Sequence, residues 1–151
     1  MKIIAQRVKH AKVEIEGHIK GQINEGWLVL LGIAHGDEES HVSLLLEKLV
    51  NLRAFSDSNG KMNLSLLQTG GSLLVVSQFT LYADFSSGRR PSFTAAGKPE
   101  SAQILYEKFI ALARAKGIFT ESGQFGMHME VSLQNSGPVT FILDSSELNI
   151  T

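Results

Sequence analysis

Two uninterrupted apolar segments constrain the fold of this chain more than any other feature of its sequence. The first runs from Trp27 to Ile33 and the second from Leu73 to Val76. A strand that is apolar at every position, and not at every second one, is covered on both faces. A helical pattern follows each segment, so each strand can connect to a parallel neighbour by a crossover. This order of elements predicts an α/β fold with buried strands in its sheet.

Both predicted helices carry a single apolar stripe. The first helix follows Asp37, whose carboxylate suits the capping position. Its stripe has helical spacing and consists of Val42, Leu45, Leu46, Leu49 and Leu52. The second helix begins near Pro99, which suits a first helical turn, and ends at Gly117. Its stripe consists of Ala102, Leu105, Tyr106, Phe109, Leu112 and Ala113.

Alternating apolar and polar residues predict strands toward both ends of the chain. Residues 12–16 alternate, and a two-residue turn at Gly17–His18 leads into a returning strand over residues 19–23. Residues 127–134 and 139–143 alternate as well, and Asn135–Pro138 separates them with the composition of a turn. The sequence contains no repeat, linker or low-complexity tract. We therefore predict one α/β domain with a mixed sheet over residues 1–151.

Composition excludes several classes of protein. The 151 residues include 14 basic and 15 acidic side chains, and 43% of them are hydrophobic, which is typical of a globular domain. The absence of cysteine rules out disulfides, thiolate nucleophiles and cysteine-ligated zinc. No apolar segment reaches the roughly 20 residues of a membrane span, and the first residues become polar too early for a secretory signal. We expect a cytoplasmic protein without a membrane segment.

The ionisable residues do not predict a metal site or a cofactor. The five histidines are scattered, and none is spaced from an acid as metal ligands are: His10, His18, His35, His41 and His128. A net charge of −1 argues against coating nucleic acid along its length, but it allows a local basic patch to hold one end of it.

The end of the second apolar strand is the first candidate site. Leu73–Val76 stops at Ser77–Thr80, and in α/β sheets ligands bind where strands end. Ser77 and Thr80 lack a base nearby in the sequence, since the nearest ionisable group is Asp84. A catalytic role would therefore use amide and backbone donors for an oxyanion. The simpler alternative, which composition alone favours, is that these groups only complete the hydrogen bonds of a strand end.

Three other segments have both a structural and a functional interpretation. Asn135–Thr140 is either an ordinary turn or a rigid backbone wedge, because Gly137 allows close approach and Pro138 fixes the chain direction. Arg89 and Arg90 are either solvated charges or phosphate contacts. Phe125, between two glycines, either stacks on a base or fills a space beneath a loop.

The combination of Ser77–Leu81 with Asn135–Thr140 resembles the bacterial-type D-aminoacyl-tRNA deacylase family. The resemblance extends from end to end and includes Ala5–Val8, Gly88–Phe93 and Gly123–Gly126. It implies a single α/β domain whose mixed sheet curls into a barrel-like core with two main helices packed on it. It also implies hydrolysis of the ester between a D-amino acid and the terminal adenosine of tRNA, in proofreading of translation, with glycyl-tRNA accepted to some degree.

The resemblance further implies a homodimer with an active site at each interface. Gly137–Pro138 would be cis and would enter the partner's pocket, where it would exclude L-amino acids, and Arg7 would orient it. Ser77, Gln78 and Phe79 would line the reacting end, with the Phe79 N–H directed at the oxyanion. Thr80 is a candidate nucleophile, although the RNA hydroxyl is the preferred one. Phe125 and Met129 would seat the terminal adenine.

Two other functions remain open on the sequence. A non-catalytic module that binds an RNA end or a nucleotide would use the same strand-end donors with Arg89, Arg90 and Phe125. A serine or threonine esterase that acts on small esters would instead use a hydroxyl of Ser77–Thr80 as its nucleophile.

Overall fold

The fold was analysed in a computed structural model that describes residues 1–148; residues 149–151, the last three of the predicted domain, lie outside the described residues. In chain order the elements are β1 (Lys2–Ile15), β2 (His18–Ile23), β3 (Gly26–Gly32), α1 (Glu39–Asn51), β4 (Phe55–Ser56), β5 (Met62–Leu64), α2 (Leu66–Thr69), β6 (Ser72–Ser77), the 3₁₀ helix η1 (Phe79–Tyr82), α3 (Pro99–Ala115), β7 (Thr120–Ser122), β8 (Glu130–Asp144) and the 3₁₀ helix η2 (Ser145–Glu147).

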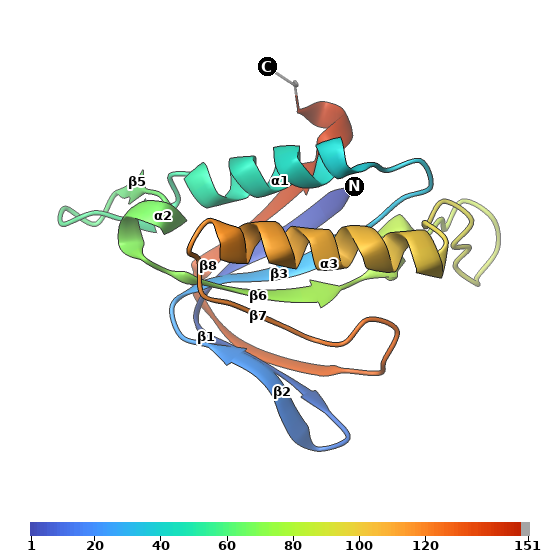
Figure 1. The fold of residues 1–151 in the computed structure, drawn as a ribbon, viewed down its shortest axis with the longest axis horizontal. Helices are drawn as coiled ribbons and strands as arrows, with labels where there is room; N and C mark the ends of the chain where they lie inside the picture. Colours follow the sequence, from blue (N-terminus) through green and yellow to red (C-terminus); the bar gives the residue numbers. More distant parts are fainter. Residues whose placement is uncertain (149–151) are drawn as a thin grey trace.

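A mixed sheet of six strands forms the centre of the described residues. β3, β6 and β7 are parallel neighbours, and β1 is antiparallel to β2, β3 and β8. β1 pairs with β3 along its first half and with β2 along its second half, while β8 follows its other edge. The sheet therefore curls into a nearly closed barrel, and α1 and α3 lie side by side across one face (Figure 1). The predicted fold class is confirmed, with the short α2 as a third helix.

Two apolar clusters hold this arrangement together. The larger lies between the sheet and the helices and includes Trp27 and Phe109, both fully buried. The smaller fills the barrel and includes Leu28 and Leu74. Neighbouring residues of β3 and β6 thus enter different clusters, which confirms that both strands are covered on both faces. Removing this apolar surface from water is the main stabilisation of such a fold.

The helices follow their predicted stripes except at Leu52, which lies just past the end of α1 in an extended conformation. The start of α1 also differs from the prediction. Its capping position is Glu38, whose N–H donates to Nδ1 of His41 at 2.9 Å. The Asp37 carboxylate instead accepts the Met1 amine at 2.7 Å and the Ala34 N–H at 2.6 Å. The prediction was wrong because the charged amine of Met1, which precedes β1, binds that carboxylate instead. No helix within residues 1–148 is long and apolar enough to cross a membrane.

Two predicted turns also differ. The β1–β2 turn consists of Glu16 and Gly17, with φ of 50° and 78°, and not of Gly17–His18. Asn135–Pro138 is not a turn between two strands, because β8 continues through it and stays paired with β1 on both sides. The pairing register shifts between Gln6 and His10 of β1, opposite this segment. The segment is therefore a kink inside one long strand, and we refer to Asn135–Val139 as the corner.

Candidate active site

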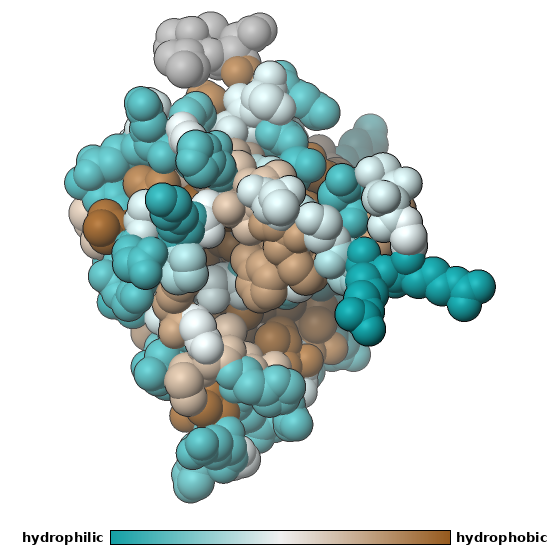
Figure 2. Space-filling model, turned by 90° about the vertical axis from the view of Figure 1, so that its right-hand side faces the viewer, coloured by the Kyte–Doolittle hydropathy of each residue, from teal (hydrophilic) through white to brown (hydrophobic). Residues whose placement is uncertain are grey.

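The carboxyl end of β6 opens into a cavity of about 470 Å³. Ser77, Gln78 and Phe79 form one side of it, and Phe125 forms another. The remaining lining residues are Leu31, Ile33, Phe93, Ala96, Gly97, Lys98, Pro99, Ala102 and Gly126. Figure 2 shows this end of the molecule, where hydrophobic side chains gather around a hollow and polar side chains surround them. The cavity is mostly apolar, and its polar lining residues are Ser77 and Gln78 at the end of the strand and Lys98 just before α3.

The backbone at the end of β6 leaves one donor at the cavity edge. The Gln78 N–H still donates to the Leu31 carbonyl at 2.8 Å, so the ladder with β3 includes this residue. Phe79 then begins η1. Because 3₁₀ hydrogen bonds join residues three apart, the first N–H of such a turn has no carbonyl partner inside it. The hydrogen bonds of η1 therefore leave the Phe79 N–H available at this end of the strand.

Thr80 has an amide neighbour and not a base. The Gln78 Nε2 donates to the Thr80 Oγ1, and an amide cannot take up the hydroxyl proton. Asp84, the nearest carboxylate in the sequence, accepts the Ser86 N–H at 2.9 Å within its own loop. That hydrogen bond holds the pKa of Asp84 below its usual value. Neither Gln78 nor Asp84 therefore supplies the general base that a threonine nucleophile requires.

The segment between β7 and β8 provides the wall formed by Phe125. The Phe125 ring packs on Tyr106 of α3 with centroids 5.7 Å apart. The Tyr106 hydroxyl donates to the Val75 carbonyl at 2.9 Å, and the same carbonyl accepts the Gly123 N–H at 3.1 Å. Phe125 thus both packs on the core and lines the cavity. Met129 does not line the cavity: its sulfur lies against Gly123, and its side chain packs on the smaller apolar cluster.

The corner is held rigidly at its base while Gly137 and Pro138 are exposed. The peptide bond between them is cis. The Asn135 side chain accepts the Val139 N–H at 2.8 Å and donates to the Val139 carbonyl at 3.1 Å. Arg7 donates to the Ser136 carbonyl at 2.9 Å and to the Ala54 carbonyl at 2.6 Å. Gly137 has φ of 149°, and an added Cβ would lie 2.6 Å from the Val139 nitrogen.

The structure does not bring the corner to the cavity within one chain. Arg7 and Ser136 line a separate groove of about 610 Å³ that includes Ser72, at the amino end of β6. Ser77 is at the other end of that strand, roughly 16 Å away for five residue steps. The predicted site residues therefore form two groups: Ser77–Thr80 with Phe125, and Arg7 with Gly137–Pro138.

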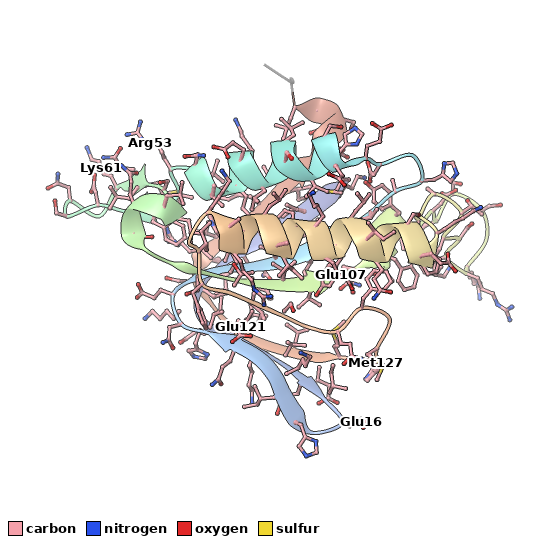
Figure 3. The ribbon with its side chains drawn as sticks, viewed as in Figure 1. Glu16, Arg53, Lys61, Glu107, Glu121 and Met127 are labelled. Atoms are coloured by element: carbon pink, nitrogen blue, oxygen red, sulfur yellow. The ribbon has the colours of Figure 1, made fainter. Side chains whose placement is uncertain are left out.

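Arg89 and Arg90 belong to neither group and are exposed in the loop between η1 and α3. Figure 3 shows Met127, between β7 and β8, toward the same end of the molecule as the tip of β6, whereas Arg53 and Lys61 lie at the opposite end. Within residues 1–148, no three His, Cys, Asp or Glu side chains are grouped as metal ligands.

Two residues of this site were not singled out in the sequence. Phe93 lines the cavity, and its ring meets Phe79 edge to face with centroids 4.9 Å apart. An aromatic residue in a polar loop, outside any apolar stripe, was the available signal. Asn135 belongs to the Asn135–Thr140 motif, but its role depends on the kink, and a turn also favours asparagine.

Comparison with known proteins agrees with this geometry. The family described as D-Tyr-tRNA(Tyr) deacylase matches residues 4–144. A relative from Clostridioides difficile (strain 630), named D-aminoacyl-tRNA deacylase, is 53% identical over 97% of this chain and 99% of its own length. A relative of the same name from Thermus aquaticus is 54% identical over 97% of each chain.

A solved structure provides a similar result. The protein named c-Myc DNA Unwinding Element Binding Protein superposes with a TM-score of 0.89 and 36% identity, over 95% of this chain and 98% of that one. Family match, full-length relatives and fold agree, which confirms the resemblance found in the sequence. The chain belongs to the D-Tyr-tRNA(Tyr) deacylase family.

Proposed function

We propose that this chain hydrolyses the ester between a D-amino acid and the terminal adenosine of tRNA, releasing the free amino acid and tRNA. The observation that carries the proposal is the full-length identity of 53–54% with relatives named for that activity. The geometry at the end of β6 supports it. A proofreading hydrolase of this kind would act in the cytoplasm, where charged tRNA is used.

The reacting end of the site would be Ser77–Thr80. The ester carbonyl would accept the Phe79 N–H, and this hydrogen bond would strengthen as its oxygen becomes an oxyanion. The 2′-hydroxyl of the terminal ribose is already beside that carbonyl, so the substrate itself supplies proximity. Ser77 and Gln78 would orient the ester. This assignment is supported by the partner of the Thr80 hydroxyl, which is an amide and cannot act as a base.

The corner would select the chirality of the amino acid bound in the active site of a second subunit. Its carbonyls would surround the α-carbon, so an L side chain would collide with Gly137–Pro138 while a D side chain points outward. Glycine has no side chain to exclude, and glycyl-tRNA would be accepted in part. Exclusion requires a wall that does not yield. The contacts of Asn135 and Arg7 at the base of the corner support this role.

A homodimer would bring the two groups of residues together. Beyond the corner, one cross-strand row of the sheet is apolar: Ile142 is 70% exposed, and the register places it opposite Ile4, which pairs with Leu30. Ile4 and Leu30 are half-buried. An apolar row that ends in an exposed isoleucine beside a projecting corner supports a subunit interface here. We assign this face, defined by Ile4, Leu30 and Ile142, to the twofold contact, with an active site at each interface.

The remaining residues would hold the RNA end. Phe125 would lie against the terminal adenine, and Met129 would support its segment from below through Gly123. Arg89 and Arg90 would contact phosphates, so activity should weaken as salt increases.

A direct assay separates this function from its alternative. Purified protein is incubated with the same tRNA charged with D-tyrosine or L-tyrosine, and the remaining ester is measured over time. We expect rapid loss of the D-ester and retention of the L-ester. No hydrolysis of either ester, with tRNA still bound, would favour a nucleic-acid-binding module. That second candidate is favoured by the name of the similar DNA Unwinding Element Binding Protein.

The roles of Thr80 and the RNA are tested separately. Thr80→Ala should retain most of the deacylation rate, because its hydroxyl has no base. Charged tRNA that ends in 2′-deoxyadenosine should be cleaved far more slowly by the unmodified enzyme. Near-complete loss of activity in a folded Thr80→Ala variant would instead restore the esterase mechanism with a side-chain nucleophile.

A further inference from the structure

Exposed aromatic rings gather at one side of the cavity: Phe79 and Phe93 line it, and Phe85 lies in the loop that carries Phe93. Phe79, Phe85 and Phe93 are 57%, 72% and 36% exposed, and the Phe79 and Phe93 rings meet edge to face. Burial of such rings is a large source of binding energy, and leaving three in water on one loop region is costly. We call these three residues the aromatic rim.

The loop that carries two of them has a defined base. Asp84 and Ser92 form a bridge with hydrogen bonds of 2.8 and 2.9 Å in the two directions. Phe85 and Phe93 each directly follow a bridged residue. Because side chains alternate along paired strands, both leave the opposite face from Asp84 and Ser92 and are diagonal neighbours. Phe85 and Phe93 thus leave the loop base on the same side, and Phe93 continues to Phe79 through their ring contact.

The same loop is positively charged. Residues 84–98 contain Arg89, Arg90 and Lys98 against a single acid, Asp84, which already accepts the Ser86 N–H. None of the side-chain ion pairs among residues 1–148 includes these three cations. Guanidinium groups free of carboxylates are available for phosphate.

We propose that the aromatic rim, with Arg89 and Arg90, binds the unpaired nucleotides that precede the terminal adenosine. This rests on the proposed function for the identity of the RNA. Proteins commonly bind single-stranded nucleic acid with exposed aromatic rings beside basic side chains. Unpaired bases stack on the rings, and the phosphates contact the basic groups. Bases within a duplex have no free face for such stacking. Contact of the rim with a rim of a second copy would bring like charges together.

The position of the rim agrees with this strand. The terminal adenosine would occupy the cavity, and the chain leaving it must cross the cavity mouth. Phe79 and Phe93 are at that mouth, and Phe85 does not line the cavity. Phe85 would thus affect nucleotides further from the ester without touching the reacting atoms, which makes it the residue to test.

The test measures binding of uncharged RNA hairpins by fluorescence anisotropy. One hairpin ends in four unpaired 3′ nucleotides, one in a single unpaired adenosine, and one is blunt. We expect Phe85→Ala to raise the Kd of the four-nucleotide hairpin about tenfold, the range of one lost base stack, and to leave the other two unchanged. Phe85→Trp should restore binding. Phe119→Ala removes another exposed ring, 60% accessible and away from the cavity lining, and should change nothing.

Hydrolysis and binding can fail independently in this design. Phe85→Ala should raise the KM for charged tRNA but leave the cleavage of a D-aminoacyl-adenosine unchanged. If neither ester is cleaved but RNA binding still depends on the overhang and on Phe85, the proposed function is contradicted. The proposal that the aromatic rim binds unpaired nucleotides is then still supported. The rim proposal is overturned if all three hairpins bind equally well to the wild type. It is also overturned if Phe85→Ala changes the oligomeric state in place of RNA binding.

Discussion

Asn135 connects the backbone on the two sides of the corner through its own side chain. One amide group both accepts the Val139 N–H and donates to the Val139 carbonyl. It therefore satisfies backbone groups that the shifted register with β1 leaves unpaired. Aspartate could accept but not donate at this position, and alanine could do neither.

Replacing Asn135 should therefore impair selection of the amino acid before it impairs chemistry. In Asn135→Ala the corner loses hydrogen bonds of about 1 kcal/mol each and yields to an L side chain. We expect the ratio of D-ester to L-ester hydrolysis to fall about tenfold, mainly because the L-ester is now cleaved. Asn51→Ala on the exposed surface of α1 is the control. An unchanged ratio in a folded Asn135→Ala protein would contradict a selective corner.

Tyr106 connects the stability of the core to pH. Burial raises the pKa of its hydroxyl to about 12, from an ordinary value of about 10. The unfolded chain therefore ionises first, so the stability due to neutral Tyr106 is complete below pH 10 and is lost as pH rises toward 12. Burial also raises the pKa of Tyr82.

We expect the free energy of unfolding to fall across this alkaline range, and to fall less steeply in Tyr106→Phe. At pH 8 that variant should be about 1 kcal/mol less stable, because it lacks the hydrogen bond to the Val75 carbonyl. Urea unfolding at pH 8, 10 and 11 measures both effects. Equal alkaline slopes in the two proteins would show that Tyr106 ionises similarly when folded and unfolded.

Among the elements, the β1–β2 hairpin has a turn that its sequence does not suit. Both central residues have positive φ, the pattern for which Asn-Gly is preferred, yet the first is Glu16. A residue with a long side chain is strained there by roughly 1 kcal/mol. Glu16→Asn should stabilise the protein by about 0.5–1 kcal/mol in urea unfolding, with deacylation unchanged. Gly17→Ala should destabilise it. A lower urea midpoint of unfolding for Glu16→Asn would contradict backbone strain at Glu16.

The elements also show what a sequence reveals about this fold. Periodicity predicted α1 and α3, whose apolar stripes have helical spacing. Short uninterrupted apolar segments predicted β3 and β6, because both faces of these strands are covered. It failed at the corner, since asparagine, glycine and proline favour turns and kinks equally, and only pairing with β1 distinguishes them. The end of β6 was identified as a site from the abrupt change at Ser77. The other side of the cavity comes from α3 and the β7–β8 segment. These segments are distant in the sequence, so no local sequence pattern predicts that they lie together.

On the scale of the whole molecule, the length of β6 separates the reacting end from the corner, so the proposed site needs two chains. In an isologous dimer each cavity would receive its partner's corner. This predicts an effect of mixing. Asn135→Ala chains keep the Phe79 N–H but have a loosened corner. Phe79→Pro chains have an intact corner but lack the N–H, because proline has no backbone donor. Phe79→Pro alone should lose about 10²–10³-fold in rate.

Asn135→Ala protein, unfolded and refolded with a tenfold excess of Phe79→Pro protein, should therefore recover its selectivity. Nearly every chain with a working Phe79 would face an intact corner, so L-ester hydrolysis should fall to the wild-type level while D-ester hydrolysis continues. An excess of the double variant, Phe79→Pro with Asn135→Ala, should leave the L-ester hydrolysis unchanged, because its corners are loosened too. If Phe79→Pro chains have no more effect than the double variant, the corner acts on its own chain. The exposed row at Ile142 then requires another explanation.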